Sequence, residues 1–168
     1  GIVDLAYIPK DRFYLYRSQW NQNDETLHIL PHWNWEGREG QVTPVFVYTS
    51  YPSAELFVNG VSQGRQTKAV PVEPTDGNRR SKEVMKRFRL MWEDVKYVPG
   101  EIRVVAYDAN GFPKMEKTVK TAGKPHHIEL EADRSILKAD GKDLSFVTVK
   151  VVDKDGNLCP NAQMSISY

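Results

Sequence analysis

The residues best suited to chemistry lie in the stretch HWNWEGREG, where His32, Trp33 and Trp35 occur within four positions. A tryptophan ring can cover the apolar face of a pyranose, so Trp33 and Trp35 are the candidate carbohydrate contacts. The alternative is packing: in a strand running through His32 and Trp35, both indoles face the same side and bury a large area. We favour packing, either inside a β-sandwich or against a neighbouring domain.

Two pairs of carboxylates could suggest a general acid and a general base. Glu36 and Glu39 lie in a predicted turn, and Glu93 and Asp94 follow the strand-like segment that ends at Trp92. Nothing in the sequence predicts a raised pKa for any of them or a position across a substrate. We therefore expect solvated side chains and predict no catalytic residue in these pairs.

Two short motifs could suggest a metal. His126 and His127 are adjacent, and adjacent residues of a strand point to opposite faces, so one ion is a poor fit. The stretch DKDGN, residues 153–157, resembles the start of a calcium loop, but an EF-hand needs Gly and Glu where Leu158 and Met164 occur. A β-turn explains this stretch, and we predict neither a metal nor another cofactor.

Composition limits the possible partners. The chain has 23 basic and 22 acidic residues, so its net charge of +1 gives no field that would collect nucleic acid. The single cysteine, Cys159, cannot form an internal disulfide and lacks a histidine pattern around it. Basic residues cluster in one place, where we predict a solvated loop: Arg79, Arg80, Lys82, Lys86, Arg87 and Arg89. No apolar run approaches the ~20 residues that cross a bilayer, so no membrane partner is expected.

One long helix is predicted near the start of the chain. After Pro9, the run KDRFYLYRSQW places Phe13, Tyr16 and Trp20 at i, i+3 and i+7 spacing. Aromatic residues lower helix propensity, so this stripe must be buried against another surface. The polar residues 21–25 then end the helix.

The residue pattern of 27–123 is typical of an all-β domain. A strand is predicted within 43–51, and Asn59-Gly60 supplies the positive φ angles of a tight type I′ hairpin. KRFRLMWEDVKY indicates a strand pair, with Phe88, Leu90 and Trp92 in phase, and a second hairpin is predicted at Asn110-Gly111. The polar interval 70–84 predicts a mobile loop. About seven short strands are typical of an immunoglobulin-like sandwich.

Residues 124–168 form a new section. The run from 144 to 152 alternates again, and Asp155-Gly156 predicts another hairpin turn. A sandwich of this type takes about 100 residues, and fewer than half of these are present. We therefore expect an incomplete domain with an exposed apolar face and unpaired strand edges.

Longer motifs resemble a known family. GIVDLAYIPKDRFYLYRSQW is similar to the last turn and helix of the (β/α)8 barrel in glycoside hydrolase family two, the bacterial β-galactosidase group. The following LHILPHWNWEGREGQVTPVFVYTSYPSAELFVNGVSQGR and the later RLMWEDVKYVPGEIRVVAYD resemble the β-sandwich that comes after this barrel in the enzymes of Bacteroides-type bacteria. The final section, IELEADRSILKADGKDLSFVTVKVVDKDGNLCPNA, is similar to bacterial immunoglobulin-like repeats of the invasin type.

The resemblance implies that the catalytic residues lie in another region of a larger enzyme. Retaining glycosidases use two glutamates about 5–5.5 Å apart, and this family carries both on barrel strands that come before the segment beginning at Gly1. No glutamate of this chain matches those motifs, so the resemblance implies a non-catalytic accessory region of a larger enzyme. Its partner would be the missing barrel of the same polypeptide, with a homo-oligomer also possible. The family often works in the periplasm or at the cell surface.

The expected fold is mainly β: an immunoglobulin-like sandwich with one N-terminal helix and a partial second sandwich. The expected boundaries are 1–26 for the barrel end, 27–123 for the sandwich and 124–168 for the incomplete domain. Two alternative functions stay open. One is a self-standing carbohydrate-binding module that uses Trp33, Trp35 or Trp92, and the other is a cell-surface spacer built from immunoglobulin-like repeats.

Overall fold

A computed structural model describes residues 1–21, 23–70 and 81–165. The chain divides into two compact units, residues 1–119 (unit 1) and 120–168 (unit 2). Strands make up 37% of the structure and helices 10%, so the mainly β prediction is confirmed. The assignment of residues 1–26 to the end of a barrel stays a prediction.

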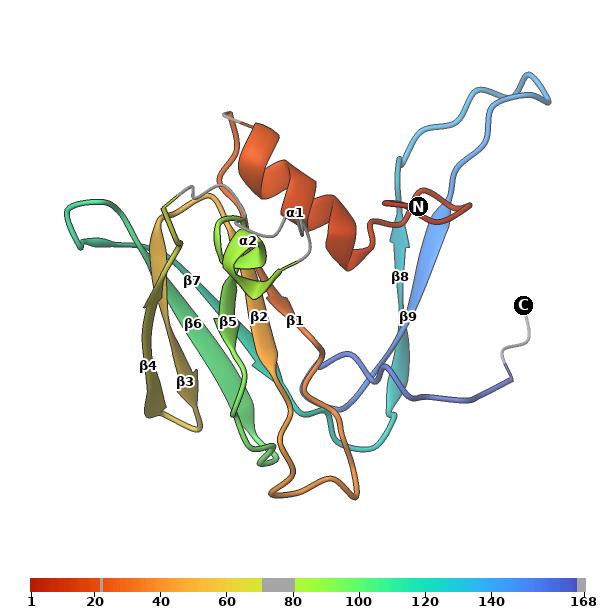
Figure 1. The fold of residues 1–168 in the computed structure, drawn as a ribbon. Helices are drawn as coiled ribbons and strands as arrows, with labels where there is room; N and C mark the ends of the chain where they lie inside the picture. Colours follow the sequence, from red (N-terminus) through yellow and green to blue (C-terminus); the bar gives the residue numbers. More distant parts are fainter. Residues whose placement is uncertain (22, 71–80, 166–168) are drawn as a thin grey trace. The chain divides into compact units, whose positions relative to one another are not determined.

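Unit 1 is a β-sandwich with a helix beside it (Figure 1). One sheet has the strand order β1-β2-β5 and the other has the order β4-β3-β6-β7. The elements are α1 (Asp11–Trp20), β1 (Leu27–Leu30), β2 (Val45–Thr49), β3 (Ser53–Val58), β4 (Val61–Thr67), α2 (Lys82–Lys86), β5 (Leu90–Trp92), β6 (Glu101–Tyr107) and β7 (Pro113–Lys120). Within the described residues, unit 1 therefore has the seven strands that the turn spacing predicts.

The core lies between the two sheets and follows from the two-residue period of the strands. Alternate side chains of each inner strand point to the partner sheet, and the other side chains point outward. The inward residues are Leu27, Ile29, Val45, Val47, Leu90 and Trp92 from the first sheet and Ala54, Leu56, Val58, Ile102, Val104 and Ala106 from the second.

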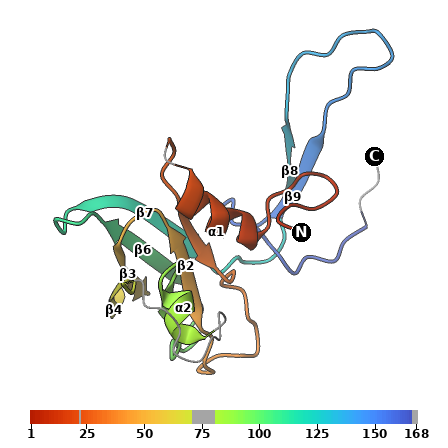
Figure 2. The same ribbon diagram turned by 45° about the horizontal axis from the view of Figure 1, so that its top comes forward.

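Helix α1 covers the outer face of the smaller sheet. It contacts β1 and β2, and the views in Figures 1 and 2 agree on this placement. The outward residues of these strands, His28 and Tyr48, are consequently shielded from solvent although they belong to no core layer. The helix is thus packed against the sheet as part of the folded unit.

Both predicted hairpins are confirmed. Asn59 and Gly60 have φ angles of 47° and 81°, and Val58 pairs directly with Val61 across the turn. In the second hairpin, the Asp108 carboxylate accepts hydrogen bonds from two backbone N–H groups of the loop, those of Asn110 and Phe112, at 2.9 Å each. In each case the turn is specified by residues next to one another in the sequence, which is why the prediction holds.

The strand pair predicted in KRFRLMWEDVKY is wrong. A single strand, β5, forms there and pairs with β2, while Phe88 is 39% exposed and lies outside the sheet. The chain leaves the sheet after Trp92 and is held by backbone hydrogen bonds to another loop: Thr43 N–H donates to Val95 O, and Tyr97 N–H donates to Gln41 O. These loop contacts bury Val95 and Tyr97 without a second strand.

The loop predicted over residues 70–84 ends earlier than expected. Residues 71–80 lie outside the described residues, but 82–86 form the short helix α2. Its first turn is capped by the Ser81 hydroxyl, which accepts a hydrogen bond from Val84 N–H at 3.4 Å. A serine three residues before the bonded N–H is the usual signal for a helix start, and it overrides the polar composition of the segment.

Gly100 offers a test of this packing. Its φ angle is +133°, and an added Cβ would collide with the side-chain oxygen of Asn59. Asn59 cannot swing away cheaply, because its oxygen accepts from Glu101 N–H at 2.8 Å and its Nδ2 donates to Pro99 O at 3.1 Å. We expect Gly100→Ala to lower the free energy of unfolding by about 3 kcal/mol, from backbone strain and the clash together.

A matched control is Gly37→Ala. Gly37 also has a positive φ of +80°, but nothing lies within 4 Å of its added Cβ. This variant should lose only the about 1–2 kcal/mol of left-handed strain. Urea denaturation followed by far-UV circular dichroism measures both, and equal losses would contradict the role given to the contact with Asn59.

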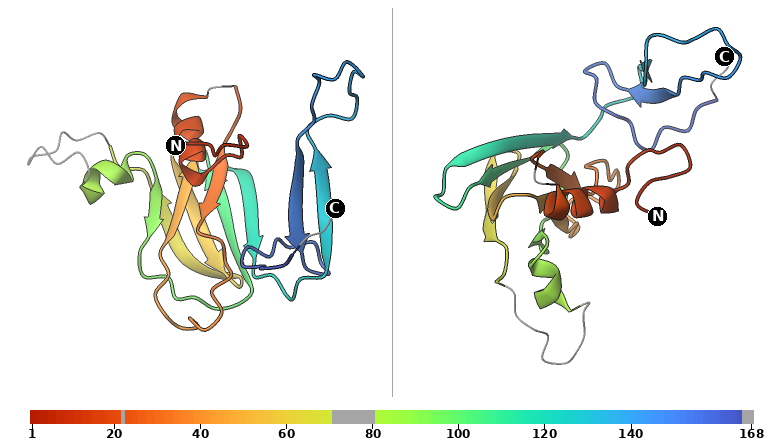
Figure 3. Two further views of the ribbon diagram at one scale, coloured as in Figure 1. Left: turned by 90° about the vertical axis from the view of Figure 1, so that its right-hand side faces the viewer. Right: turned by 90° about the horizontal axis from the view of Figure 1, so that it is seen from above.

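Unit 2 is a single pair of strands within the described residues. β8 (His127–Ala132) and β9 (Val147–Val152) are antiparallel, as Figure 3 shows. Much of its apolar surface is uncovered: the side chains at least 43% exposed include Ile128, Leu130, Phe146, Val147 and Val149. The turn at Asp155-Gly156 forms as predicted, with Gly156 at φ 80°. An isolated two-stranded sheet is marginally stable in water; the assignment of residues 124–168 to an incomplete domain stays a prediction.

Candidate functional site

Trp33 is a core residue. Its side chain is 0% exposed, and its ring meets that of Tyr97 edge-on at 5.1 Å. The indole N–H donates to the backbone oxygen of Val98 at 2.9 Å, so the polar atom is satisfied. No face of this ring is open to a ligand in the structure.

Trp35 lies in a loop and not in the predicted strand. β1 ends at Leu30, because Pro31 has no N–H to continue a ladder, and residues 32–35 are irregular. His32 and Trp35 do not diverge to opposite faces; their rings stack at 4.4 Å, and the Trp35 N–H donates to His32 O at 2.8 Å. The strand geometry predicted for this stretch is therefore wrong. Trp35 is partly buried, and the Arg38 guanidinium lies 5.2 Å from its ring centre.

The face of α1 that meets the sheet differs from the predicted one. Tyr14 stacks on His28 at 4.0 Å, and Asp11 Oδ1 lies 2.8 Å from His28 Nε2. Ser18 is the buried residue of the helix, whereas Trp20 is 74% exposed. The expectation that the whole stripe of Phe13, Tyr16 and Trp20 is buried is wrong, since the helix is rotated to place Tyr14 and Ser18 on the sheet side.

The contact between α1 and β1 is expected to weaken in acid. Burial lowers the pKa of His28 below its ordinary value of 6.5, although the hydrogen bond to Asp11 opposes this, and Lys117 adds a positive charge nearby. The unfolded chain takes up a proton near pH 6.5 and the folded one resists it. The contribution of His28 to stability should therefore be constant above pH 6.5 and fall as the pH drops below it.

This prediction is checked by urea midpoints of the chain between pH 7.5 and pH 5. His28→Gln keeps a polar group at the site but cannot titrate, so its midpoints should vary less with pH over this interval. Equal pH dependence of the two proteins would show that another group is responsible.

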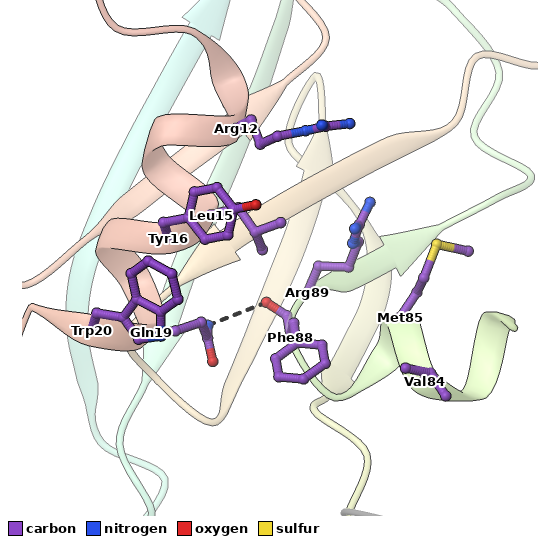
Figure 4. A pocket seen from close by; sticks show the side chains of 9 residues that line it. All are labelled: Arg12, Leu15, Tyr16, Gln19, Trp20, Val84, Met85, Phe88 and Arg89. Atoms are coloured by element: carbon purple, nitrogen blue, oxygen red, sulfur yellow. Dashed lines mark hydrogen bonds between the residues drawn. The ribbon is translucent and has the colours of Figure 1, made fainter. Parts of the chain in front are cut away.

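Exposed and partly buried residues of α1 form one wall of an open groove. The groove has a volume of about 560 Å³, and α2 with the segment following it forms the opposite wall. Figure 4 shows the lining side chains, which are Arg12, Leu15, Tyr16, Gln19, Trp20, Val84, Met85, Phe88 and Arg89. Gln19 Nε2 donates to Phe88 O at 3.3 Å and links the two walls. The groove is mostly apolar and carries two guanidinium groups.

Two features of the sequence pointed to parts of this groove. Tyr16 and Trp20 lie on one side of the helix and stack on each other at 4.8 Å. The basic cluster places Arg89 directly after Phe88, but the interpretation as a solvated loop is wrong for Arg89, which is half-buried with its guanidinium 5.5 Å from the Tyr48 ring centre. Arg79 and Arg80, also in that cluster, lie outside the described residues. Helix α2 was not predicted from the sequence, so the second wall of the groove could not be predicted either.

The carboxylate pairs show no arrangement for acid–base catalysis. Glu39 accepts a hydrogen bond from Gly37 N–H at 3.2 Å within a turn. Glu93 lies 2.8 Å from the Lys82 ammonium, which lowers the pKa of Glu93. A general acid needs a raised pKa, whereas the pKa of Glu93 is lowered.

The two candidate metal motifs have other contacts. His126 and His127 approach each other, with their Nδ1 atoms 3.1 Å apart, so the prediction of opposite faces is wrong; β8 begins only at His127. Asp153 uses its carboxylate oxygens to accept backbone and side-chain N–H groups. Across residues 1–21, 23–70 and 81–165, no group of three or more His, Cys, Asp or Glu side chains could hold a metal ion.

Cys159 and Trp92 are both buried. Cys159 is buried, and burial raises the pKa of its thiol, so it is not an activated nucleophile. Trp92 is a core residue, 4% exposed, whose N–H donates to Gly64 O at 3.0 Å. Of the helices described, none is both long and apolar enough to span a bilayer.

Two family models match the chain. Residues 40–113 match a domain of unknown function, DUF4982, and residues 128–168 match the glycoside hydrolase family 2 C-terminal domain 5. The first match falls within the sandwich of unit 1 and the second within unit 2.

Curated relatives align with the whole chain. The β-galactosidase BoGH2A of Bacteroides ovatus is 44% identical over all of this chain, which spans 18% of that protein. A putative β-glucuronidase of Formosa agariphila is 31% identical over all of this chain and 15% of its own length. The chain thus spans less than a fifth of the length of these relatives.

Solved structures of similar enzymes share the fold. A β-glycosidase from Bacteroides vulgatus has a TM-score of 0.77 at 31% identity, covering 95% of this chain and 18% of that one. A glycosyl hydrolase family 2 member from Bacteroides cellulosilyticus has a TM-score of 0.75 at 32% identity, covering 94% and 22%. This chain is therefore a relative of the glycoside hydrolase family 2 enzymes and corresponds to a small C-terminal part of them.

Proposed function

We propose that this chain is the accessory, non-catalytic region of a retaining glycoside hydrolase whose catalytic barrel lies elsewhere in the same polypeptide. The observation that carries the proposal is the alignment: a relative named as a β-galactosidase matches the chain from end to end, yet over only 18% of its own length. The described carboxylates support it, since Glu39 is held in a turn and Glu93 in an ion pair. The sandwich would brace the barrel and help to set the geometry of the enzyme.

The proposed substrate of the whole enzyme is a β-galactoside. The support is the higher identity to the β-galactosidase, 44%, than to the putative β-glucuronidase, 31%. The relevant assay compares the isolated chain with the full-length protein on p-nitrophenyl β-D-galactoside and on the matching β-glucuronide. We expect hydrolysis of the galactoside by the full-length protein and none by the chain. Turnover by the isolated chain at an enzymatic rate would overturn the proposal.

A second candidate function is direct contact with carbohydrate. The observation in its favour is Trp35, which is only partly buried, whereas Trp33 has no exposed face. Calorimetric titration of the chain with galactosides tests it. Saturable binding that disappears in Trp35→Ala, with an unchanged circular dichroism spectrum, would establish the contact; absence of binding would remove it.

A further inference from the structure

The groove between α1 and α2 leaves a large apolar area uncovered by the described residues. Trp20 is 74% exposed and Phe88 is 39% exposed, and both line it. The helix and the segment after α2 line the same groove, and Gln19 bonds across it to Phe88. Exposed apolar grooves of this size mark surfaces that another group covers.

The groove also has a positive charge that the described residues leave uncompensated. Arg12 and Arg89 both line it, and Figure 4 shows their guanidinium groups toward the upper end of the view, with Trp20 and Phe88 toward the lower end. Among the ion pairs of residues 1–21, 23–70 and 81–165, none involves either arginine. Asp11, next to Arg12, is bound to His28. The Nε atom of Arg89 is buried and has no hydrogen-bond partner there.

These features define the chemistry of what would fill the groove. An apolar or aromatic side chain would cover Trp20 and Phe88. A carboxylate beside it would pair with Arg12 and Arg89, because a guanidinium group matches a carboxylate in both charge and geometry. A charged pair shielded from water in this way contributes more than an exposed one.

We propose that the occupant is a segment of the catalytic part of the same polypeptide, which brings an apolar side chain and a neighbouring carboxylate to the groove. The inference rests on the proposed function and adds the contact surface and the chemistry of the partner. The relatives place more than four fifths of their length outside the region that this chain matches, since it spans 15% and 18% of them. That remainder is present at high effective concentration because it is covalently attached.

A second copy of the chain is a poorer occupant. A two-fold contact places the same patch of both copies face to face. Such a contact would bring the arginines of both copies, four guanidinium groups in all, into one interface, and gathering like charges there is unfavourable. The groove has no acidic lining residue to offset them.

Photo-crosslinking in the full-length protein tests the occupant. A benzophenone amino acid replaces Trp20, and mass spectrometry identifies the attached peptide. We expect an intramolecular crosslink to a peptide outside residues 1–168 that contains apolar residues and an Asp or Glu. A crosslink to a second copy, a crosslink only within residues 1–168, or none would overturn the proposal. The same probe at Phe112, 64% exposed at the β6–β7 hairpin, is the control for non-specific reaction.

Charge reversal tests the carboxylate. Arg89→Glu and Arg12→Glu should each lower the crosslink yield from position 20 about tenfold or more, as expected for loss of a desolvated charge pair. Lys96→Glu makes the same charge change at an exposed residue that does not line the groove and should leave the yield unchanged. Equal yields in all three variants would overturn the carboxylate contact. The galactoside assay tests the proposed function separately. If the isolated chain hydrolyses no galactoside and no crosslink forms, only the inference about the groove is refuted.

Discussion

Trp33→Ala is expected to lower the free energy of unfolding of unit 1 by about 3–5 kcal/mol, the usual cost of truncating a fully buried tryptophan. Trp33 has no exposed surface and packs against Tyr97 within the hydrophobic core cluster. The variant leaves a cavity and also removes the donor to Val98 O. Domains of this size are stable by only about 5–15 kcal/mol, so the loss is a large fraction of the total stability and should shift the urea midpoint strongly downward.

Two further variants separate the contributions. Trp33→Phe keeps most of the ring and removes the N–H, so its loss should be smaller and should reflect the unpaired Val98 oxygen and a reduced cavity. Trp20→Ala removes the same side chain from a site that is 74% exposed and should change stability by no more than about 0.5 kcal/mol in the isolated chain. The measurement is urea denaturation at constant pH, followed by far-UV circular dichroism. A loss in Trp20→Ala as large as that in Trp33→Ala would contradict the burial described here.

The result also bears on the choice between packing and sugar contact for the two tryptophans. If Trp33→Ala abolished carbohydrate binding, the loss would follow from unfolding and would not identify a contact. Trp35 is therefore the informative position, since its ring stacks on His32 in a loop outside the two sheets. Binding studies on Trp35→Ala need the stability of that variant measured alongside.

The features predictable from the sequence were those that depend on neighbouring residues. Asn59-Gly60 encodes its own turn, and the same is true of the loop that Asp108 holds together. The alternation in β3 and β6 then determines which side chains enter the core. Burial of Trp33 could also be predicted, because burying a large aromatic ring contributes strongly to the core of a small sandwich.

The features that could not be predicted depend on contacts between distant residues. Helical spacing shows that Phe13, Tyr16 and Trp20 share a side, but it does not show which side meets the sheet. That orientation is decided by Tyr14 and its stacking on His28, a residue outside the helix. Helix α2 has five residues, which is too short for a period to be visible, so the second wall of the groove could not be predicted from the sequence pattern.

Asp153→Ala is expected to abolish the ordered structure at the base of unit 2. Asp153 is 3% exposed, and its carboxylate accepts from the backbone N–H groups of Gly123, Asp155 and Asn157 at 2.8–2.9 Å. The bond to Gly123 ties the start of the unit to a turn 30 residues later. Alanine leaves these donors without their acceptor in a buried place, and that penalty is far larger than the value of one exposed hydrogen bond.

Hydrogen exchange measured residue by residue provides the test, because unit 1 serves as an internal reference. In Asp153→Ala, the amides of β8 and β9 should lose their protection while those of β3 and β6 keep theirs. Asp155→Ala is the matched control: its exposed side chain lies in the same turn, so β8 and β9 should stay protected. Protection of β8 in Asp153→Ala would show that the strand pair does not depend on the carboxylate.

Acidification should reproduce the effect of the substitution in the unchanged protein. The hydrogen bonds from Gly123 N–H and from Asn157 hold the pKa of Asp153 far below its ordinary value of 3.8. A depressed pKa in the folded state means that the stabilisation is fully present above pH 3.8 and is lost as the pH falls toward the folded-state pKa. Unit 2 should therefore lose more stability on acidification than it does in Asp153→Asn, which keeps only the titration of other carboxylates with lowered pKa values, such as Glu131, Asp133 and Asp140. The difference between these two pH profiles isolates the contribution of the charge from that of the side-chain shape.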